Sequence, residues 1–159
     1  MIMKRLSRFL LLKSNFLITI VLFTFCSPQQ TKKTNDYKLI LNYLKEYHNV
    51  QSLNNFKRIF VLTENGCSSC NKKFSKLMLD QICDSSSLFL IFTSGTRVDI
   101  SKFIEKKNNI YFNSNLSTFN NNLFDSTSII YLKNNSIDTI ITIEASQIDY
   151  QINLIENWN

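Results

Sequence analysis

The chain is most informative between residues 58 and 70, where it reads Arg58-Ile59-Phe60-Val61-Leu62-Thr63-Glu64-Asn65-Gly66-Cys67-Ser68-Ser69-Cys70. Residues 58–63 are a largely apolar run with β-branched and aromatic side chains, which predicts a buried β-strand. Residues 71–83 carry apolar side chains at helical spacing on one face, with lysines mainly on the other. The cysteine pair therefore lies between a strand and the start of a helix.

Two cysteines with this C-x-x-C spacing suit redox chemistry at a helix start. The free N–H groups and the positive end of the helix stabilise a thiolate on the first sulfur, Cys67. Cys70 is close enough to close a reducible disulfide with it. Because so short a loop stabilises the folded chain little, a purely structural bond is a poor use of this spacing. Zinc and copper sites use the same spacing, and the position between strand and helix favours the redox interpretation.

The N-terminus predicts export from the cytoplasm. Basic residues without any acid occupy residues 1–13, and residues 16–25 form a short, almost entirely apolar run. This run is shorter than the roughly 20 apolar residues that a transmembrane helix needs. Cys26 follows it directly, in an arrangement that resembles the lipobox of bacterial lipoproteins, although Phe25 stands where that family has a small residue. The resemblance implies that Cys26 is lipidated; an uncleaved signal anchor and a soluble secreted form are the alternatives, and all three place the domain outside the cytoplasm.

Composition and length limit the classes of function. We expect an export signal at residues 1–26, a polar tether at 27–35 and one domain at 36–159. After the signal, 14 basic and 12 acidic residues remain, a net charge of +2 without a long basic stripe. Binding to nucleic acid therefore has little support. The length suits one domain with a single core, which we expect to be a monomer.

The remaining chain alternates between helical and strand patterns. Helices are predicted at 36–49, after Cys67 as far as 83, from Asp99 to 107 and at 146–158, and residues 116–123 predict a helical turn or loop. Strands are predicted at 57–63, 88–93 and 109–113, followed by a β-hairpin of 128–133 and 137–143 around Asn134-Asn135. This order predicts an α/β fold: a central mixed sheet with flanking helices, mainly parallel strands and a C-terminal antiparallel hairpin.

The order of strand, C-x-x-C helix, strand, helix, hairpin and final helix resembles the thioredoxin fold, over about residues 36–158. The short strand near Tyr111 is similar to the insert of membrane-tethered TlpA-type thioredoxins and of peroxiredoxin relatives. The resemblance implies that Cys67 is an exposed nucleophile and Cys70 a buried resolving thiol, with no cofactor or metal. Thr127 stands where this family usually has a cis-proline, and its backbone would there pair with an incoming peptide. The only proline of the chain is Pro28, and Val61 stands where many thioredoxins bury an acid.

Further side chains near the motif have both a functional and an ordinary interpretation. Lys72 and Lys73 would favour a thiolate or simply be solvated, and Glu64 would accept a proton or be a solvated loop carboxylate. Cys83 would be a third metal ligand, a second resolving thiol or, the preferred interpretation, a buried small apolar side chain. His48 is the only histidine, which argues against a Cys–His hydrolase.

Taken together, the sequence predicts an exported, membrane-tethered thiol–disulfide oxidoreductase of the cell envelope. Its partners would be protein thiols and disulfides, and its lipid anchor would hold it to the membrane. One alternative is a metal-binding module in which Cys67, Cys70 and Cys83 hold copper or zinc. The other is a non-catalytic surface lipoprotein of thioredoxin fold. The sequence leaves the direction of electron flow open.

Overall fold

The computed structural model describes residues 28–65, 67–93, 99–106, 109–113 and 124–158. The chain divides into two compact units, Met1–Lys32 and Lys33–Asn159. Of the first unit only residues 28–32, at the start of a helix, are described. The predicted export signal, Cys26 and the segment 116–123 lie outside the described residues.

Helix α2 (Pro28–His48) contains residues 36–48 of the predicted helix 36–49 and begins earlier, whereas Asn49 has a positive φ of 58° and lies outside it. Residues 28–35, which the polar composition predicted as a tether, are helical. Proline suits the first helical position because its ring fixes φ near the helical value and it has no N–H to leave unpaired. In the second unit, Tyr37, Ile40 and Leu44 are buried as their spacing predicted, whereas Tyr47 at the end of the same series is exposed.

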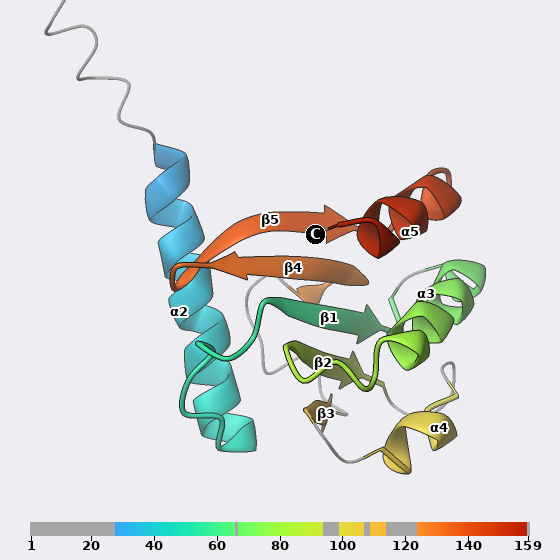
Figure 1. Ribbon diagram of the computed structural model, residues 1–159, viewed down its shortest axis with the longest axis horizontal. Helices are drawn as coiled ribbons and strands as arrows, with labels where there is room; N and C mark the ends of the chain where they lie inside the picture. Colours follow the sequence, from blue (N-terminus) through green and yellow to red (C-terminus); the bar gives the residue numbers. More distant parts are fainter. Residues whose placement is uncertain (1–27, 66, 94–98, 107–108, 114–123, 159) are drawn as a thin grey trace, which may run out of the picture. The chain divides into compact units, whose positions relative to one another are not determined.

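The described strands form one five-stranded mixed sheet, and Figure 1 shows its strands side by side. Its strands are β1 (Arg58–Thr63), β2 (Ser87–Phe92), β3 (Ile110–Asn113), β4 (Ser128–Lys133) and β5 (Ser136–Thr142), in the order β3-β2-β1-β4-β5. β1, β2 and β3 are parallel neighbours, whereas β4 runs antiparallel to both β1 and β5. The predicted α/β architecture with a mixed sheet and a C-terminal hairpin is confirmed.

Helices cover both faces of the sheet, and successive side chains of β1 therefore enter different cores. Phe60 and Leu62 pack on the face covered by α3 (Ser68–Asp80), α4 (Ser101–Ile104) and α5 (Ile148–Glu156). Ile59 and Val61 pack on the opposite face, which the second-unit part of α2 covers. Figure 1 shows α3 and α5 together at the end of β1 and α2 on the other side. Burial on both faces fixes the carboxyl end of β1, where the cysteine pair begins.

The hairpin turn has the backbone that its sequence predicted. Asn134 and Asn135 connect β4 to β5, with φ of 52° and 56°. Positive φ at both central residues defines a type I′ turn, whose twist matches that of the flanking strands, and asparagine tolerates this region better than most residues. The turn fixes the register of the two C-terminal strands.

We expect Asn134→Ala to lower the free energy of unfolding by about 1 kcal/mol, because the Cβ of alanine is strained at positive φ. Asn134→Gly should leave stability unchanged or raise it slightly, since glycine carries no such strain. Urea unfolding of both variants measures the difference. An equal loss in the two variants would contradict the turn assignment.

Asp84 joins the start of β1 to the start of β2. Its carboxylate accepts hydrogen bonds from the Arg58 guanidinium at 2.9 Å, the Ser87 hydroxyl at 2.7 Å and the Ser86 backbone N–H at 2.9 Å. Partial burial alone would raise the pKa of Asp84, but the hydrogen bonds from Ser87, Ser86 and Arg58 outweigh it and hold this pKa well below its usual range. The ionised carboxylate therefore stabilises the fold.

We expect Asp84→Asn to lower the free energy of unfolding by about 1–3 kcal/mol at pH 7, because charged hydrogen bonds are lost. Since the folded pKa is depressed, the unfolded chain binds the proton more readily. The ionised Asp84 carboxylate thus contributes its full stabilisation above about pH 4, and this stabilisation is lost as the pH falls below that value. Urea unfolding at pH 7 and pH 3 should show that the free energies of unfolding of variant and parent differ less at pH 3 than at pH 7. The exposed Asp138→Asn serves as control, and an equal gap at both pH values would contradict the assignment.

Candidate functional site

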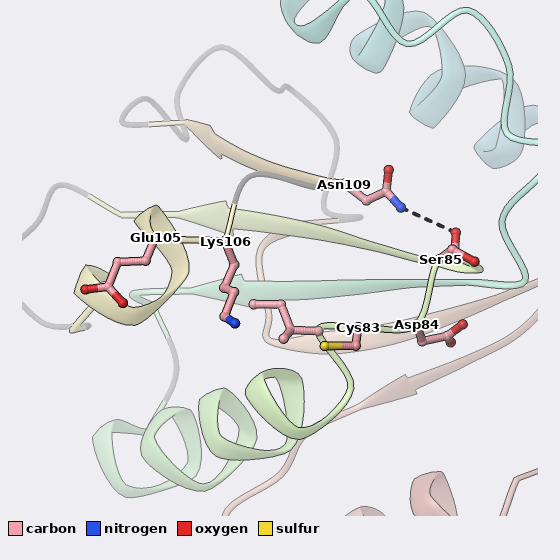
Figure 2. Close-up of a pocket in the computed structure, with 7 residues that line it drawn as sticks. Cys83, Asp84, Ser85, Glu105, Lys106 and Asn109 are labelled. Atoms are coloured by element: carbon pink, nitrogen blue, oxygen red, sulfur yellow. Dashed lines mark hydrogen bonds between the residues drawn. The ribbon is translucent and has the colours of Figure 1, made fainter.

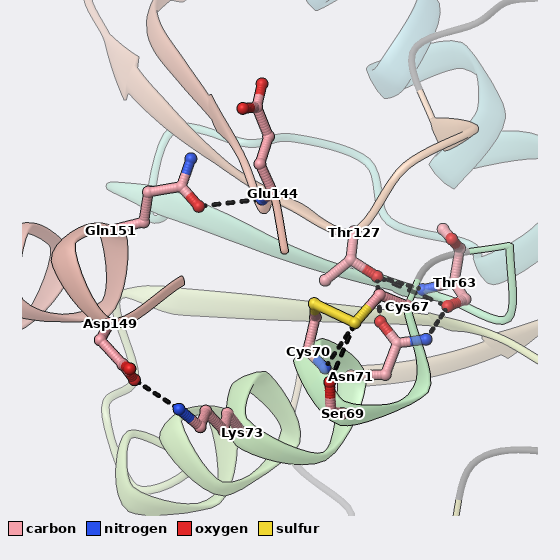
Figure 3. The surroundings of a disulfide bond; sticks show 10 residues. All are labelled: Thr63, Cys67, Ser69, Cys70, Asn71, Lys73, Thr127, Glu144, Asp149 and Gln151. Carbon is pink, nitrogen blue, oxygen red and sulfur yellow. Dashed lines mark hydrogen bonds and ion pairs between the residues drawn. A yellow bond between two sulfur atoms is a disulfide. The ribbon is translucent and has the colours of Figure 1, made fainter. Parts of the chain in front are cut away.

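The cysteine pair lies where β1 ends and α3 begins, as its place in the sequence predicted. Cys67 is the N-cap of α3, with an extended backbone at φ −63° and ψ 125°, and Cys70 lies in the first helical turn. Their sulfur atoms form a disulfide, with the two Cα atoms 5.2 Å apart. Figure 3 shows this bond at the start of α3, next to Thr127 at the entry of β4.

The two cysteines differ in their access to solvent. Cys67 is exposed, whereas Cys70 is only 3% exposed. The Cys70 backbone N–H points to Cys67 Sγ at 3.2 Å, and the Ser69 hydroxyl lies 3.0 Å from the same sulfur. Both groups can donate a hydrogen bond to a thiolate on Cys67 when the disulfide is reduced. One sulfur is thus placed to meet a partner and the other is shielded behind it.

A buried hydrogen-bond network lies next to the cysteine pair (Figure 3). The Thr127 hydroxyl donates to Asn71 Oδ1 at 2.7 Å and accepts from the Thr63 backbone N–H at 3.2 Å. The Asn71 side-chain amide donates in turn to the Thr63 carbonyl at 2.7 Å. We call these three residues the Thr63–Asn71–Thr127 network. Because all three are buried, it ties the end of β1, the first turn of α3 and the entry of β4 into one unit.

The strand register explains why Thr127 reaches this position. Val61 of β1 pairs with Ser128 of β4, so the residue before Ser128 lies beside the end of β1. The Thr127 carbonyl accepts the Ile143 backbone N–H at 2.8 Å. Of the peptide bonds that the structure describes, none is cis. The predicted pairing of the Thr127 backbone with an incoming peptide stays a prediction, and the described role of its side chain is to support Asn71.

The two lysines after Cys70 have different surroundings. Lys73 forms an ion pair with Asp149 of α5 at 2.6 Å, which links the two helices on this face of the sheet. Both side chains are at least half exposed, so the pair adds little stability. Lys72 is exposed as well, and it lines a groove that is described below.

The carboxylate of Glu64 is engaged at the end of the neighbouring strand. It accepts a hydrogen bond from the hydroxyl of Thr93, which follows β2. Val61, at the position where many thioredoxins bury an acid, is fully buried in the apolar core on the α2 side. Proton transfer to the cysteine pair through Glu64 stays a prediction.

The preferred prediction for Cys83 is wrong. Cys83 is a free, exposed thiol and not a buried apolar side chain. It follows the carboxyl end of α3 and lines a pocket of about 590 Å³ with Asp84, Ser85, Glu105, Lys106 and Asn109 (Figure 2). The length of α3 separates it from Cys67 by roughly 20 Å. Cys83 can therefore neither resolve a disulfide on Cys67 nor share a metal ion with it in the same chain.

His48 lies on the other side of the sheet from α3. Its ring contacts Tyr43 and Tyr111, with ring centroids 5.5 Å and 5.0 Å away, among the residues that pack around α2. Burial lowers the pKa of His48. This environment agrees with the prediction that the chain does not carry a Cys–His hydrolase site.

Asn71 is the functional residue that the motif search missed. The sequence does hold a signal for it: Asn71 precedes Phe74 by three residues and Met78 by seven, so it lies on the buried stripe of α3. A polar side chain on such a stripe needs a hydrogen-bond partner. The pattern identifies the need, but it cannot name Thr63 and Thr127 as the partners.

Within the described ranges, no three His, Cys, Asp or Glu side chains come together as a metal site would require. None of the helices described combines the length and the apolarity that crossing a lipid bilayer takes. No protein-family model, curated protein or solved structure matches the chain. The mixed sheet, its hairpin and the cysteine pair at the start of α3 are compatible with a thioredoxin-like fold.

Proposed function

We propose that this chain exchanges thiols and disulfides with protein partners, through Cys67 and Cys70 on a domain of thioredoxin-like fold. One observation carries the proposal: an exposed Cys67 caps α3 and forms a disulfide with Cys70, which is buried behind it. A disulfide that only stabilised the chain would gain little from closing so short a loop. Exchange chemistry, in contrast, needs one accessible sulfur and one shielded sulfur within reach of each other.

The reaction would proceed in two exchange steps. In the reduced protein, the Cys67 thiolate attacks one sulfur of a partner disulfide, forms a mixed disulfide and releases the other partner sulfur as a thiolate. The Cys70 thiolate then attacks Cys67 Sγ and releases the partner's second thiolate. Two electrons pass from the Cys67–Cys70 dithiol to the partner, and the partner's thiolates take protons from solvent. The same steps in reverse oxidise a partner dithiol.

The groups around Cys67 support the first step. The Cys70 N–H and the Ser69 hydroxyl lie within hydrogen-bond distance of its sulfur, and both favour the thiolate as nucleophile and as leaving group. The start of α3 adds the positive end of the helix dipole. The buried Thr63–Asn71–Thr127 network holds this first turn in place, so Cys70 stays within reach of Cys67 when the disulfide is reduced.

We place this chemistry outside the cytoplasm, on a membrane anchor. The support comes from the sequence: a basic segment, the short apolar run 16–25 and Cys26 in a lipobox-like position. Disulfides persist in that compartment, so a dithiol there has substrates and also needs a redox partner to restore it.

A test with a neutral reagent separates a working dithiol from inert thiols. The full-length chain, held in a non-ionic detergent and reduced with dithiothreitol that is then removed, is mixed with hydroxyethyl disulfide. Alkylation and mass shift then follow each cysteine. We expect Cys67 and Cys70 to become oxidised as a pair, at least tenfold faster than Cys83 reacts, because the Cys70 N–H and the Ser69 hydroxyl stabilise a thiolate on Cys67. A pair that reacts no faster than Cys83 would refute the proposed function.

A second test addresses the anchor. We expect a bacterial host that expresses the chain to incorporate a labelled fatty acid into it, and Cys26→Ser to abolish the label while Cys83→Ser retains it. Gel fluorescence after coupling an alkyne fatty acid to a dye measures the incorporation. Equal labelling of the Cys26→Ser variant would contradict lipidation at Cys26 without touching the exchange chemistry.

A further inference from the structure

A groove begins beside the cysteine pair and runs along the outer face of α3 toward α4. It has a volume of about 740 Å³ and is lined chiefly by Ser68, Ser69, Lys72, Lys76, Leu79 and Lys102. Ser68 follows Cys67 directly in the chain, so the groove begins at the residue next to the exposed cysteine. A segment of a partner protein that reaches Cys67 therefore has this groove next to it.

The spacing of α3 builds one wall of the groove. Ser68, Lys72 and Leu79 are separated by four and seven residues, which places them in one stripe along the helix, and Lys76 borders that stripe. Lysine stems are apolar along their length while their ammonium groups stay in water. The wall thus offers apolar contact at its base and positive charge at its rim.

The charge of the groove is mainly positive. Four exposed lysines line it, namely Lys72, Lys73, Lys76 and Lys102, against the carboxylate of Asp99. The Asp99 carboxylate already accepts hydrogen bonds from the Ser101 N–H and hydroxyl. Of the four lysines, only Lys73 forms an ion pair within the described part of the chain. Lys72 and Lys76 are therefore open to negative charge from outside, whereas Lys102 also interacts with the Asp99 carboxylate.

We propose that this groove binds an acidic segment of the partner protein, directly beside the partner's reactive cysteine. The inference rests on the proposed function, since it names the substrate class of the same site. A helix rises about 1.5 Å per residue, so Lys72 and Lys76 lie roughly 7 and 14 Å along α3 from Cys67. An extended peptide covers that span in about two to four residues. The carboxylates that fit thus lie about two to four residues from the partner's cysteine.

Reporter peptides test this preference. Each is a peptide of otherwise uncharged residues with one cysteine, linked as a mixed disulfide to 2-nitro-5-thiobenzoate. It carries aspartates, serines or lysines two to four residues from that cysteine, on either side. The reduced Cys67 thiolate attacks the peptide sulfur and releases the coloured thiolate, and Cys70 then releases the peptide. Stopped-flow absorbance measures the rate with the full-length chain in a non-ionic detergent.

At low ionic strength we expect the aspartate reporter to react about tenfold faster than the serine reporter, and the lysine reporter to react slowest. In 1 M NaCl the ratio should fall to within about twofold, because the screening length is then about 3 Å. The variant Lys72→Ala/Lys76→Ala/Lys102→Ala should lose the preference. The control Lys38→Ala/Lys45→Ala/Lys133→Ala removes the same charge away from the groove and should keep it.

Equal rates for the three reporters, or an equal loss of preference in the two triple variants, would overturn the acidic-segment proposal. Reaction of the serine reporter and of hydroxyethyl disulfide at the expected rate shows in either case that exchange itself works. Failure with all reagents refutes the proposed function instead. The chain could instead bind vesicles of anionic lipid through the same lysines and show no rate advantage for the aspartate reporter. This result would also overturn the proposal, because the groove would then bind a membrane.

Discussion

Cys67→Ser is expected to reduce exchange with a protein disulfide by roughly a hundredfold or more, since the attacking thiolate is lost. Cys70 cannot replace it, because its side chain is only 3% exposed. The measurement is the rate at which the reduced full-length chain cleaves a model protein disulfide, followed by alkylation of the released thiols. Cys83→Ser is the matched control: it removes the other exposed thiol that the structure describes and should leave the rate unchanged.

Cys70→Ser should separate the two steps. The first attack still takes place, but no internal thiolate follows, so the partner stays bound to Cys67 as a mixed disulfide. Non-reducing gels and mass spectrometry detect this adduct, and dithiothreitol removes it. Full activity of Cys67→Ser, or trapping through Cys83 in place of Cys67, would contradict the assigned roles.

Thr127→Val is the substitution outside the cysteine pair with the largest expected effect on the site. It preserves the shape of the side chain but removes the hydroxyl that serves both Asn71 and Thr63. A buried Asn71 oxygen and a buried backbone N–H are then left without this partner, which should lower the free energy of unfolding by about 2–3 kcal/mol. Asn71→Ala should destabilise as well, because the Thr63 carbonyl loses its Asn71 donor and the Thr127 hydroxyl loses its Asn71 acceptor.

A double-mutant cycle makes this prediction specific to the network. The combined variant should be less destabilised than the sum of the single variants, with a coupling of about 1 kcal/mol, because the two side chains share a hydrogen bond. Urea unfolding under oxidising conditions provides all four free energies. The exposed Thr142→Val should change stability by less than about 0.5 kcal/mol. Additive effects of Asn71→Ala and Thr127→Val would show that the network does not act as a unit.

Much of the fold follows from local patterns in the sequence. The continuous apolar run at 88–93 predicted a strand covered on both faces, and all residues of β2 are buried. Asn134-Asn135 predicted the turn because few other residues accept positive φ twice in succession. The cysteine pair at the start of a helix was likewise readable, because the strand, the loop and the amphipathic stretch are adjacent in the chain.

Long-range contacts could not be predicted in the same way. The Thr127 hydroxyl bonds to residues 56 and 64 positions away, and only the register of β1 and β4 brings them together. Cys83 was misassigned because helical spacing continued the apolar stripe past the true end of α3 at Asp80, whereas the residues after it form turns at the surface. The groove along α3 is completed by Asp99 and Lys102, which lie far from α3 in the sequence.

A redox titration of the full-length chain tests the central claim most directly. The chain, in a non-ionic detergent, is equilibrated with dithiothreitol and glutathione buffers of graded potential, and alkylation mass shifts report the state of Cys67 and Cys70. We predict one reversible two-electron transition that disappears in Cys67→Ser, with a midpoint between about −270 and −120 mV, the range of thioredoxin-like proteins. That midpoint also sets whether the chain reduces or oxidises its partners. A pair that stays in one state across the whole range would contradict a function in thiol–disulfide exchange.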